Sequence, residues 1–378
     1  MKYNCDFDAK GQVVFVEPTW VTGETCLFNI SNPFEYNTGK IKLTKIRKEF
    51  LDELEREGFV ITYDKKYSSN EVVSLIMNDL SLCGYEVDPT IYKKEFDKLI
   101  FSSGGEKLNY PYSLTMREYF ENPFFPAVIK NEIANGGIDK FLIETPEQVE
   151  IIKKFYNDFY DIPDYKYVFN CSIFQQLIET PTKYKTYLRV LMSASGDVMG
   201  ASLKYSKVEM KKREAEGLLE KHFWNEKSKY YLNCTGMFNY YSGGDNIYFT
   251  QPRYSSDKQE ILLAHGIDPS NVKIPNDVLE VASNISTKCN PQLGIMCGID
   301  FILNEKDNKW YYLENQAFPA IDEWAVAKGI RVPNVKSIND YVKYNELDLQ
   351  ARYDALMMYM NKKLSLSENE KGLVKSYK

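Results

Sequence analysis

Residues 298–319, GIDFILNEKDNKWYYLENQAFP, hold two apolar runs on either side of a polar turn. This pattern predicts a β-hairpin. Centring the turn on Asp307 places Asp300 on one arm opposite Glu314 on the other. Like charges that lie directly opposite each other destabilise a strand pair. The hairpin therefore needs a chemical reason for its two carboxylates.

Strand alternation supplies such a reason. It places four side chains of the second arm on one face: Trp310, Tyr312, Glu314 and Gln316. With Asp300 opposite Glu314, this face presents two carboxylates and an amide oxygen, which are hard ligands suited to Mg²⁺. A divalent cation would turn the repulsion into stabilisation. In the alternative register both acids face solvent and bind nothing.

Composition excludes several classes of protein. The net charge of -6 and the pI of about 5.4 argue against a general nucleic-acid-binding surface. No segment approaches the roughly 18 apolar residues of a membrane span, so neither nucleic acid nor membrane is an expected partner. The 7 cysteines are dispersed without a CxxC pair, which is typical of a protein in a reducing cytoplasm.

The length of 378 residues predicts two or three packed units and an α/β (α+β) fold class. The first part alternates strands at 13–16 and 59–62 with helices at 43–58 and 71–82, which predicts a partly parallel sheet. A capping box at Thr145 opens a helix, and 168–178 is a further strand or strand pair. Further helices are expected at 275–288 and 347–364. The predicted parts are 1–97, 98–185, 186–345 and 346–378.

A second hairpin, YLRVLMSASGDVMGASLKYS at 187–206, carries positive charge. A two-residue turn at Ser195–Gly196 pairs Tyr187 with Lys204 and Arg189 with Ser202. Arg189 and Lys204 then lie as diagonal neighbours on one face, where a phosphate or carboxylate would relieve their repulsion. A solvated sheet face is the alternative.

Two further segments are candidates for ligand binding. Lys130 ends an apolar strand just before Asn135-Gly136-Gly137, which suggests a point charge for phosphate below a backbone loop. Neither GxxxxGK[ST] nor GxGxxG is present, and a plain hairpin turn is the alternative. Residues 239–256, rich in Gly, Tyr and Asn, are expected to form a long loop. With Arg253, this loop is either an acceptor-recognising element or a disordered insertion.

The order of these features resembles the ATP-grasp superfamily, which includes D-alanine–D-alanine ligase and glutathione synthetase. A lysine and glycine loop come first, followed by the strand at 174–178, the basic hairpin and the acidic hairpin. The resemblance covers about residues 98 to 320. It implies an ATP-grasp fold, in which an N-terminal α/β domain precedes two α+β subdomains that clasp ATP.

The resemblance also implies the nucleotide-binding residues. Lys130 resembles the lysine that contacts the α-phosphate, and Gly136 and Gly137 belong to the mobile loop over the phosphates. The upstream nucleotide lysine is expected at Lys98, with Lys107 as second choice. The segment that holds adenine and ribose matches Gln175, Gln176, Ile178 and Glu179, with backbone contacts at Gln176 and Ile178.

The remaining implied residues are those of catalysis and metal binding. Arg189 and Lys204 match the basic pair that binds the transferring phosphate and the substrate carboxylate. Asp300, Glu314 and Gln316 match the ligands of Mg²⁺, with Mn²⁺ as an alternative ion. The usual motif is Glu-x-Asn, so Gln316 departs from it by one methylene. Asn315 would need a β-bulge to reach the metal face.

The resemblance implies an ATP-dependent ligase that activates a carboxylate as an acyl phosphate and joins it to an amine. The partners would be a small carboxylate and a small amine, or a peptide, and a homodimer is a family-level expectation. A nucleotide-binding protein with little catalysis is the alternative from another class. A ligase that modifies a peptide or protein side chain is a third.

Overall fold

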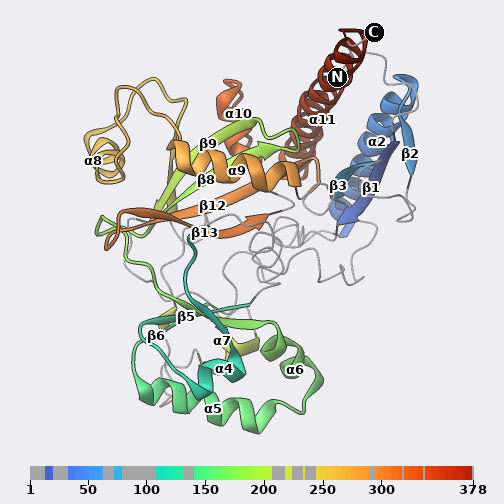
Figure 1. Ribbon diagram of the computed structural model, residues 1–378. Coiled ribbons are helices and arrows are strands. Elements are labelled where there is room, and N and C mark those ends of the chain that lie inside the picture. Colours follow the sequence, from blue (N-terminus) through green and yellow to red (C-terminus); the bar gives the residue numbers. More distant parts are fainter. Residues whose placement is uncertain are drawn as a thin grey trace.

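The computed structural model describes eleven segments of the chain: 13–19, 33–62, 72–78, 108–131, 140–206, 218–223, 233–234, 244–288, 294–316, 319–334 and 337–376. These segments form three β-sheets with associated helices (Figure 1). The mixed helical and sheet architecture confirms the predicted fold class. None of the helices in these segments has the length and apolar character needed to cross a membrane.

The first sheet is parallel, as expected. Its central strand β1 (Val13–Thr19) lies between β2 (Val60–Thr62) and β3 (Val72–Asn78), and α2 (Pro33–Arg56) connects β1 to β2. The helix predicted at 71–82 is wrong, because residues 72–78 form β3. Strands of parallel sheets are often continuous apolar runs, and VVSLIM shows no helical period.

The second sheet is antiparallel and, with its helices, forms the lower part of Figure 1. The capping box at Thr145 is confirmed and opens α5. The predicted strand at 168–178 is correct only in its second half, since a helix ends at Asn170. The elements of this part are β4 (Ser113–Thr115), α4 (Met116–Glu121), β5 (Ala127–Asn131), β6 (Phe141–Ile143), α5 (Pro146–Phe159), α6 (Pro163–Asn170), β7 (Ser172–Gln176), α7 (Leu218–Phe223) and β10 (Asn233–Cys234).

The third sheet carries both predicted hairpins in the strand order β11-β9-β8-β12-β13. One face packs against α8 (Ser256–Ala264) and α9 (Asn276–Lys288), and the other meets α10 (Asp322–Ala327) and α11 (Ile338–Ser376) (Figure 1). The predicted helices at 275–288 and 347–364 are thus confirmed. The strands are β8 (Thr186–Ser193), β9 (Val198–Ser206), β11 (Gly244–Tyr248), β12 (Met296–Asn304) and β13 (Lys309–Gln316).

The predicted long loop at 239–256 is wrong for residues 244–248 and right for residues 249–255, which hold neither helix nor strand. Residues 244–248 form β11, which pairs with β9, and α8 begins at Ser256. The Gly and Asn content suggested a loop, but Ile247 is fully buried in the core below α8 and holds the strand in the sheet.

In the acidic hairpin the predicted pairing is right and the predicted turn is wrong. Asp300 pairs with Glu314 as expected, but Asn304 pairs with Lys309, so the turn is not centred on Asp307. The register shifts by one residue between Phe301, opposite Tyr312, and Asp300, which leaves Leu313 as a β-bulge.

The bulge changes which side chains share a face. Trp310 and Tyr312 lie on the α9 face with Phe301, whereas Glu314 and Gln316 lie with Asp300 on the α10 face. The expectation that all four alternate residues share one face was therefore wrong for the two aromatic side chains.

The basic hairpin also contains a β-bulge, and its predicted turn is likewise wrong. Tyr187 pairs with Lys204 and Arg189 with Ser202, as predicted. The turn, however, is a three-residue loop in which Gly196 adopts φ 84°, and the Ser193 amide donates to the Asp197 carbonyl. A bulge at Met199 restores the register farther along β9.

Candidate functional site

Four charged residues predicted from the sequence meet on the α10 face of the third sheet. They come from four consecutive strands: Lys204 from β9, Arg189 from β8, Asp300 from β12 and Glu314 from β13. Lys204, Arg189 and Asp300 are each less than a tenth exposed. Buried charges at this density require partners, and the geometry of these partners defines the site.

Arg189 and Asp300 form a bidentate ion pair. The guanidinium Nε donates to Asp300 Oδ1 and Nη2 donates to Oδ2, both at 2.7 Å. Burial raises the pKa of Asp300 more than the Arg189 charge lowers it, and Glu314 raises it further. The Arg189 Cζ lies 5.7 Å from the centroid of the Tyr187 ring, so the two side chains form a cation–π contact.

Lys204 has a partner that sequence reasoning missed. Its Nζ lies 3.0 Å from Oε1 of Glu323 on α10, and the Ser202 hydroxyl donates to the same oxygen at 2.7 Å. Burial alone would raise the pKa of Glu323, but the charges of Lys204 and Arg189 outweigh it and the pKa is lowered. The signal in the sequence was a pair of carboxylates, Asp322 and Glu323, inside the otherwise apolar run from Ala320 to Ala327.

A glycine allows α10 to come this close to the sheet. A Cβ built on Gly200 of β9 would lie 2.3 Å from the carbonyl oxygen of Glu323 and 2.4 Å from its carbonyl carbon. No side chain fits in that space, so a glycine at this point of β9 is what lets Glu323 reach Lys204, four residues farther along the strand.

The residues present suit a magnesium ion. Asp300 and Glu314 face each other across β12 and β13, and the Gln316 amide nitrogen lies 3.5 Å from Glu314 Oε1. The two hydrogen bonds from Arg189 use one lone pair on each oxygen of Asp300. A carboxylate has about four lone-pair sites, so one on each oxygen is left for a metal ion. Within the described residues no group of three or more His, Cys, Asp and Glu could hold a metal. The donor set therefore depends on the amide of Gln316.

Asn315 lies on the opposite face. It pairs with Ile299 of the core, and neither its Oδ1 nor its Nδ2 has a hydrogen-bond partner among the described residues. The bulge that Asn315 would need is present, but it precedes Glu314 and so leaves Asn315 turned away from Asp300.

The predicted nucleotide residues of the second sheet lie together. The Lys130 ammonium donates to the side-chain oxygen of Gln175, whose amide nitrogen donates to Ser113 at 3.2 Å. The backbone N–H of Gln176 donates to the Tyr112 carbonyl at 2.7 Å, so that donor is engaged within the protein. Ile178 is buried and follows directly.

Glu179 joins the second sheet to the acidic hairpin. Its carbonyl accepts from the Glu305 amide at 2.9 Å, and its carboxylate lies 3.4 Å from Lys306 Nζ. Arg253 is exposed between β11 and α8. The remaining predicted residues lie outside the described segments: Lys98, Lys107, Asn135, Gly136 and Gly137.

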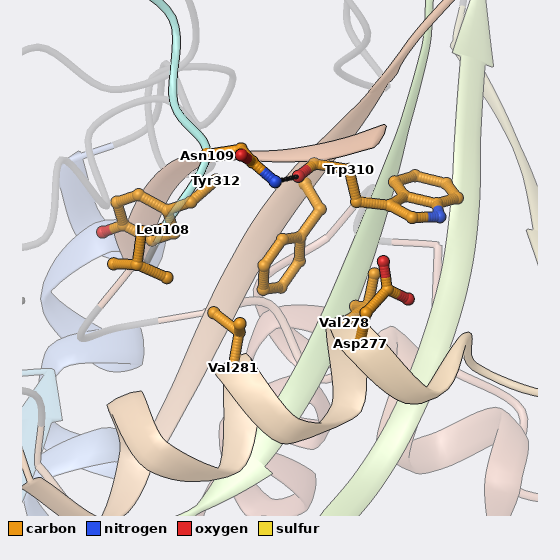
Figure 2. Close-up of a pocket in the computed structure, with 8 residues that line it drawn as sticks. Leu108, Asn109, Asp277, Val278, Val281, Trp310 and Tyr312 are labelled. Carbon is orange, nitrogen blue, oxygen red and sulfur yellow. Dashed lines mark hydrogen bonds between the residues drawn. The ribbon is translucent and has the colours of Figure 1, made fainter. Parts of the chain in front are cut away.

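A small pocket lies on the other face of the same hairpin, between β13 and α9 (Figure 2). Trp310, Tyr312 and Val281 line it, and the Asn109 amide donates to the Trp310 carbonyl at 3.4 Å. It contains none of the predicted site residues. The bulge at Leu313 thus separates an aromatic pocket from an ionic site.

No family model matches the sequence, and no curated protein matches it. Among solved structures the chain is similar to ATP-grasp ligases. D-alanine–D-alanine ligase from Bacillus anthracis has 10% identity and a TM-score of 0.39, over 91% of this chain and 99% of that one. The ATP-grasp ligase PsnB with a minimal precursor has 12% identity and a TM-score of 0.35, over 74% of this chain and 64% of that one.

The L-amino acid ligase from Bacillus licheniformis has 11% identity and a TM-score of 0.34, over 81% of this chain and 59% of that one. The chain therefore spans less than two thirds of PsnB and of this ligase.

Proposed function

We propose that this protein is an ATP-dependent ligase that activates a carboxylate as an acyl phosphate and joins it to an amine, releasing ADP and phosphate. The observation that carries the proposal is the arrangement of buried Lys204, Arg189 and Asp300 beside half-buried Glu314 on four adjacent strands of one sheet. Two anion-binding cations lie beside two opposed carboxylates, as the transfer of a phosphoryl group requires.

Each group has a defined role in this proposal. Asp300, Glu314 and Gln316 would hold a magnesium ion, which when bound would supply positive charge against the phosphates. Arg189 and Lys204 clamp the transferring phosphoryl group and orient the substrate carboxylate. Asp300 and Glu323 hold these two cations in place beforehand. Such catalysis is positioning and electrostatics, and needs neither histidine nor cysteine.

Lys130 and Gln175 would hold the nucleotide on the second sheet, with Ile178 and the carbonyl of Gln176 at the adenine edge and Glu179 near the ribose. Gly136, Gly137 and the upstream Lys98 complete the nucleotide site in the proposal, and Arg253 contacts the acceptor. The division at residues 97, 185 and 345, a cytoplasmic location and a homodimer belong to the same proposal.

The test is ADP release from MgATP with each common amino acid supplied as carboxylate and amine. Asp300→Asn and Glu314→Gln should each lower the rate by about 100-fold or more, because each removes a charge from the metal site. Substitution by alanine is avoided at Asp300, since it would leave Arg189 buried without its partner. Glu305→Gln alters an exposed carboxylate in the same hairpin and should keep the wild-type rate.

Wild-type rates in both site variants would refute the metal assignment. One observation favours a second function, a nucleotide-binding protein with little turnover: both Asp300 oxygens are held by Arg189. Calorimetry distinguishes the two functions, because the second predicts ATP binding without substrate-dependent ADP.

A further inference from the structure

Only one of the two carboxylate oxygens of Glu323 has hydrogen-bond partners among the described residues. The side chain is 1% exposed, and its Oε1 accepts from Ser202 and pairs with Lys204. Its Oε2 has no hydrogen-bond partner among the described residues. A buried, unpartnered carboxylate oxygen is costly, and it leaves an acceptor to which a hydrogen-bond donor can bind.

A second carboxylate lies beside it at the start of α10. Asp322 is partly exposed, and burial followed by the Glu323 charge raises its pKa. Two tyrosines border the pair. Burial and then the charge of Asp322 raise the pKa of Tyr248 and of Tyr344, so both hydroxyls stay protonated and polar beside these acids.

The charge balance shows which kind of ligand is missing. Two cations, Arg189 and Lys204, face four carboxylates: Asp300, Glu314, Asp322 and Glu323. In the proposed reaction Asp300 and Glu314 are neutralised by the metal, while Arg189 and Lys204 turn to phosphate. The α10 pair then keeps its negative charge in a buried place that favours a further cation.

An ammonium group fits this place better than a second metal. It carries three N–H donors, and the Glu323 Oε2 oxygen and the Asp322 carboxylate are two acceptors for them. A metal would need more anionic ligands, and in the described part of the chain no group of three or more His, Cys, Asp and Glu has the arrangement to hold one.

We propose that Asp322 and Glu323 bind the ammonium group of a primary-amine acceptor and that Asp322 takes its proton, an inference that rests on the proposed ligase function. Asp322 removes one proton from R–NH₃⁺, and the freed lone pair attacks the carbonyl carbon of the acyl phosphate. The C–N bond forms and the C–O bond to phosphate breaks. Phosphate leaves with the bonding electrons and takes the second proton of the nitrogen, and Asp322 releases its proton to water.

The experiment compares a neutral with a cationic nucleophile. Hydroxylamine is neutral near pH 7 and traps an acyl phosphate as a hydroxamate, whereas methylamine, putrescine and L-lysine carry ammonium groups. Each common amino acid serves as carboxylate probe, with products measured by mass spectrometry. Asp322→Asn should lower amine coupling by about 100-fold, the usual scale of general base catalysis. It should leave hydroxamate formation within about twofold, because neutral hydroxylamine has a free lone pair before attack and its one departing proton goes to phosphate.

Matched variants separate chemistry from folding. Asp164→Asn changes an exposed aspartate in the first turn of α6 and should alter neither product. Asp322→Glu keeps a carboxylate and should retain part of the amine coupling. Unchanged hydroxamate yield in Asp322→Asn also shows that the variant is folded.

Three outcomes would overturn the inference while the ligase function stands. These are unchanged amine coupling in Asp322→Asn, an equal fall in hydroxamate and amine products, and wild-type protein that forms hydroxamate but couples none of the three amines. If wild-type protein forms no hydroxamate with any carboxylate probe, the proposed ligase function itself fails, and the inference fails with it.

Discussion

Gly200→Ala tests how the ionic site is held together. The new Cβ would lie 2.3 Å from the Glu323 carbonyl oxygen, and ordinary contact begins at 3.4 Å, so α10 must move by about 3.4 − 2.3 = 1.1 Å. That displacement would stretch the 3.0 Å separation of Lys204 Nζ and Glu323 Oε1 to about 4 Å, the limit of an ion pair. Overpacking of this kind costs about 1–3 kcal/mol.

Urea unfolding followed by tryptophan fluorescence measures this cost, since Trp310 and Trp324 are both buried against the third sheet. Gly298→Ala is the matched control on β12. Its Cβ would lie 3.0 Å from the Pro319 side chain and at an ordinary contact distance of 3.8 Å from Arg189, so a small local shift of Pro319 can relieve the contact. We expect Gly200→Ala to lose about 1–3 kcal/mol, and to lose more than Gly298→Ala.

The reasoning fails if Gly200→Ala unfolds within about 0.5 kcal/mol of the wild-type protein, the range of a neutral surface change. It also fails if the two glycine variants lose the same amount. In that case the close approach of α10 to β9 would not be what fixes Glu323 beside Lys204.

Three other predictions concern single side chains. Burial lowers the pKa of His265 below 6.5, so the unfolded chain takes up a proton at this side chain when the pH falls below about 6.5. The free energy of unfolding should therefore drop by up to about 1.4 kcal/mol per pH unit through this residue. His265→Leu should remove this contribution to the slope in urea titrations at different pH. Asp348→Ala removes the buried partner of Arg352, whose Nε lies 2.9 Å from Asp348 Oδ2. The free energy of unfolding should fall by about 3–5 kcal/mol in the same assay. A fall below about 1 kcal/mol would contradict the pairing. Lys130→Met should weaken ATP binding by about tenfold in calorimetry because it removes a charge–phosphate contact, and unchanged affinity would place the nucleotide elsewhere.

Much of the site could be predicted because both hairpins are local. Strand alternation and a turn between two apolar runs were enough to pair Asp300 with Glu314 and Arg189 with Ser202. The bulges at Met199 and Leu313 could not be predicted, since a bulge leaves the composition of a strand unchanged. The assignment of Trp310 to the metal face failed for that reason.

The contacts that could not be predicted are distant in the chain. Glu323 accepts from Ser202 across 121 residues, and no sequence period connects them. The strand at 72–78 was predicted as helix because its pairing with β1 depends on a distant segment too. The local sequence pattern therefore identified the strands that carry the charged side chains. It did not identify α10, whose Glu323 neutralises Lys204.

The two bulges also affect how the chain tolerates changes in length. In each hairpin the extra residue lies between the turn and the charged pair, so the register at the turn is uncoupled from the register at the site. An insertion or deletion at either tip can be absorbed by gaining or losing a bulge. Removal of Leu313 itself would restore strict alternation along β13, so Tyr312 would still face Phe301 and Glu314 would still pair with Asp300 on the α10 face.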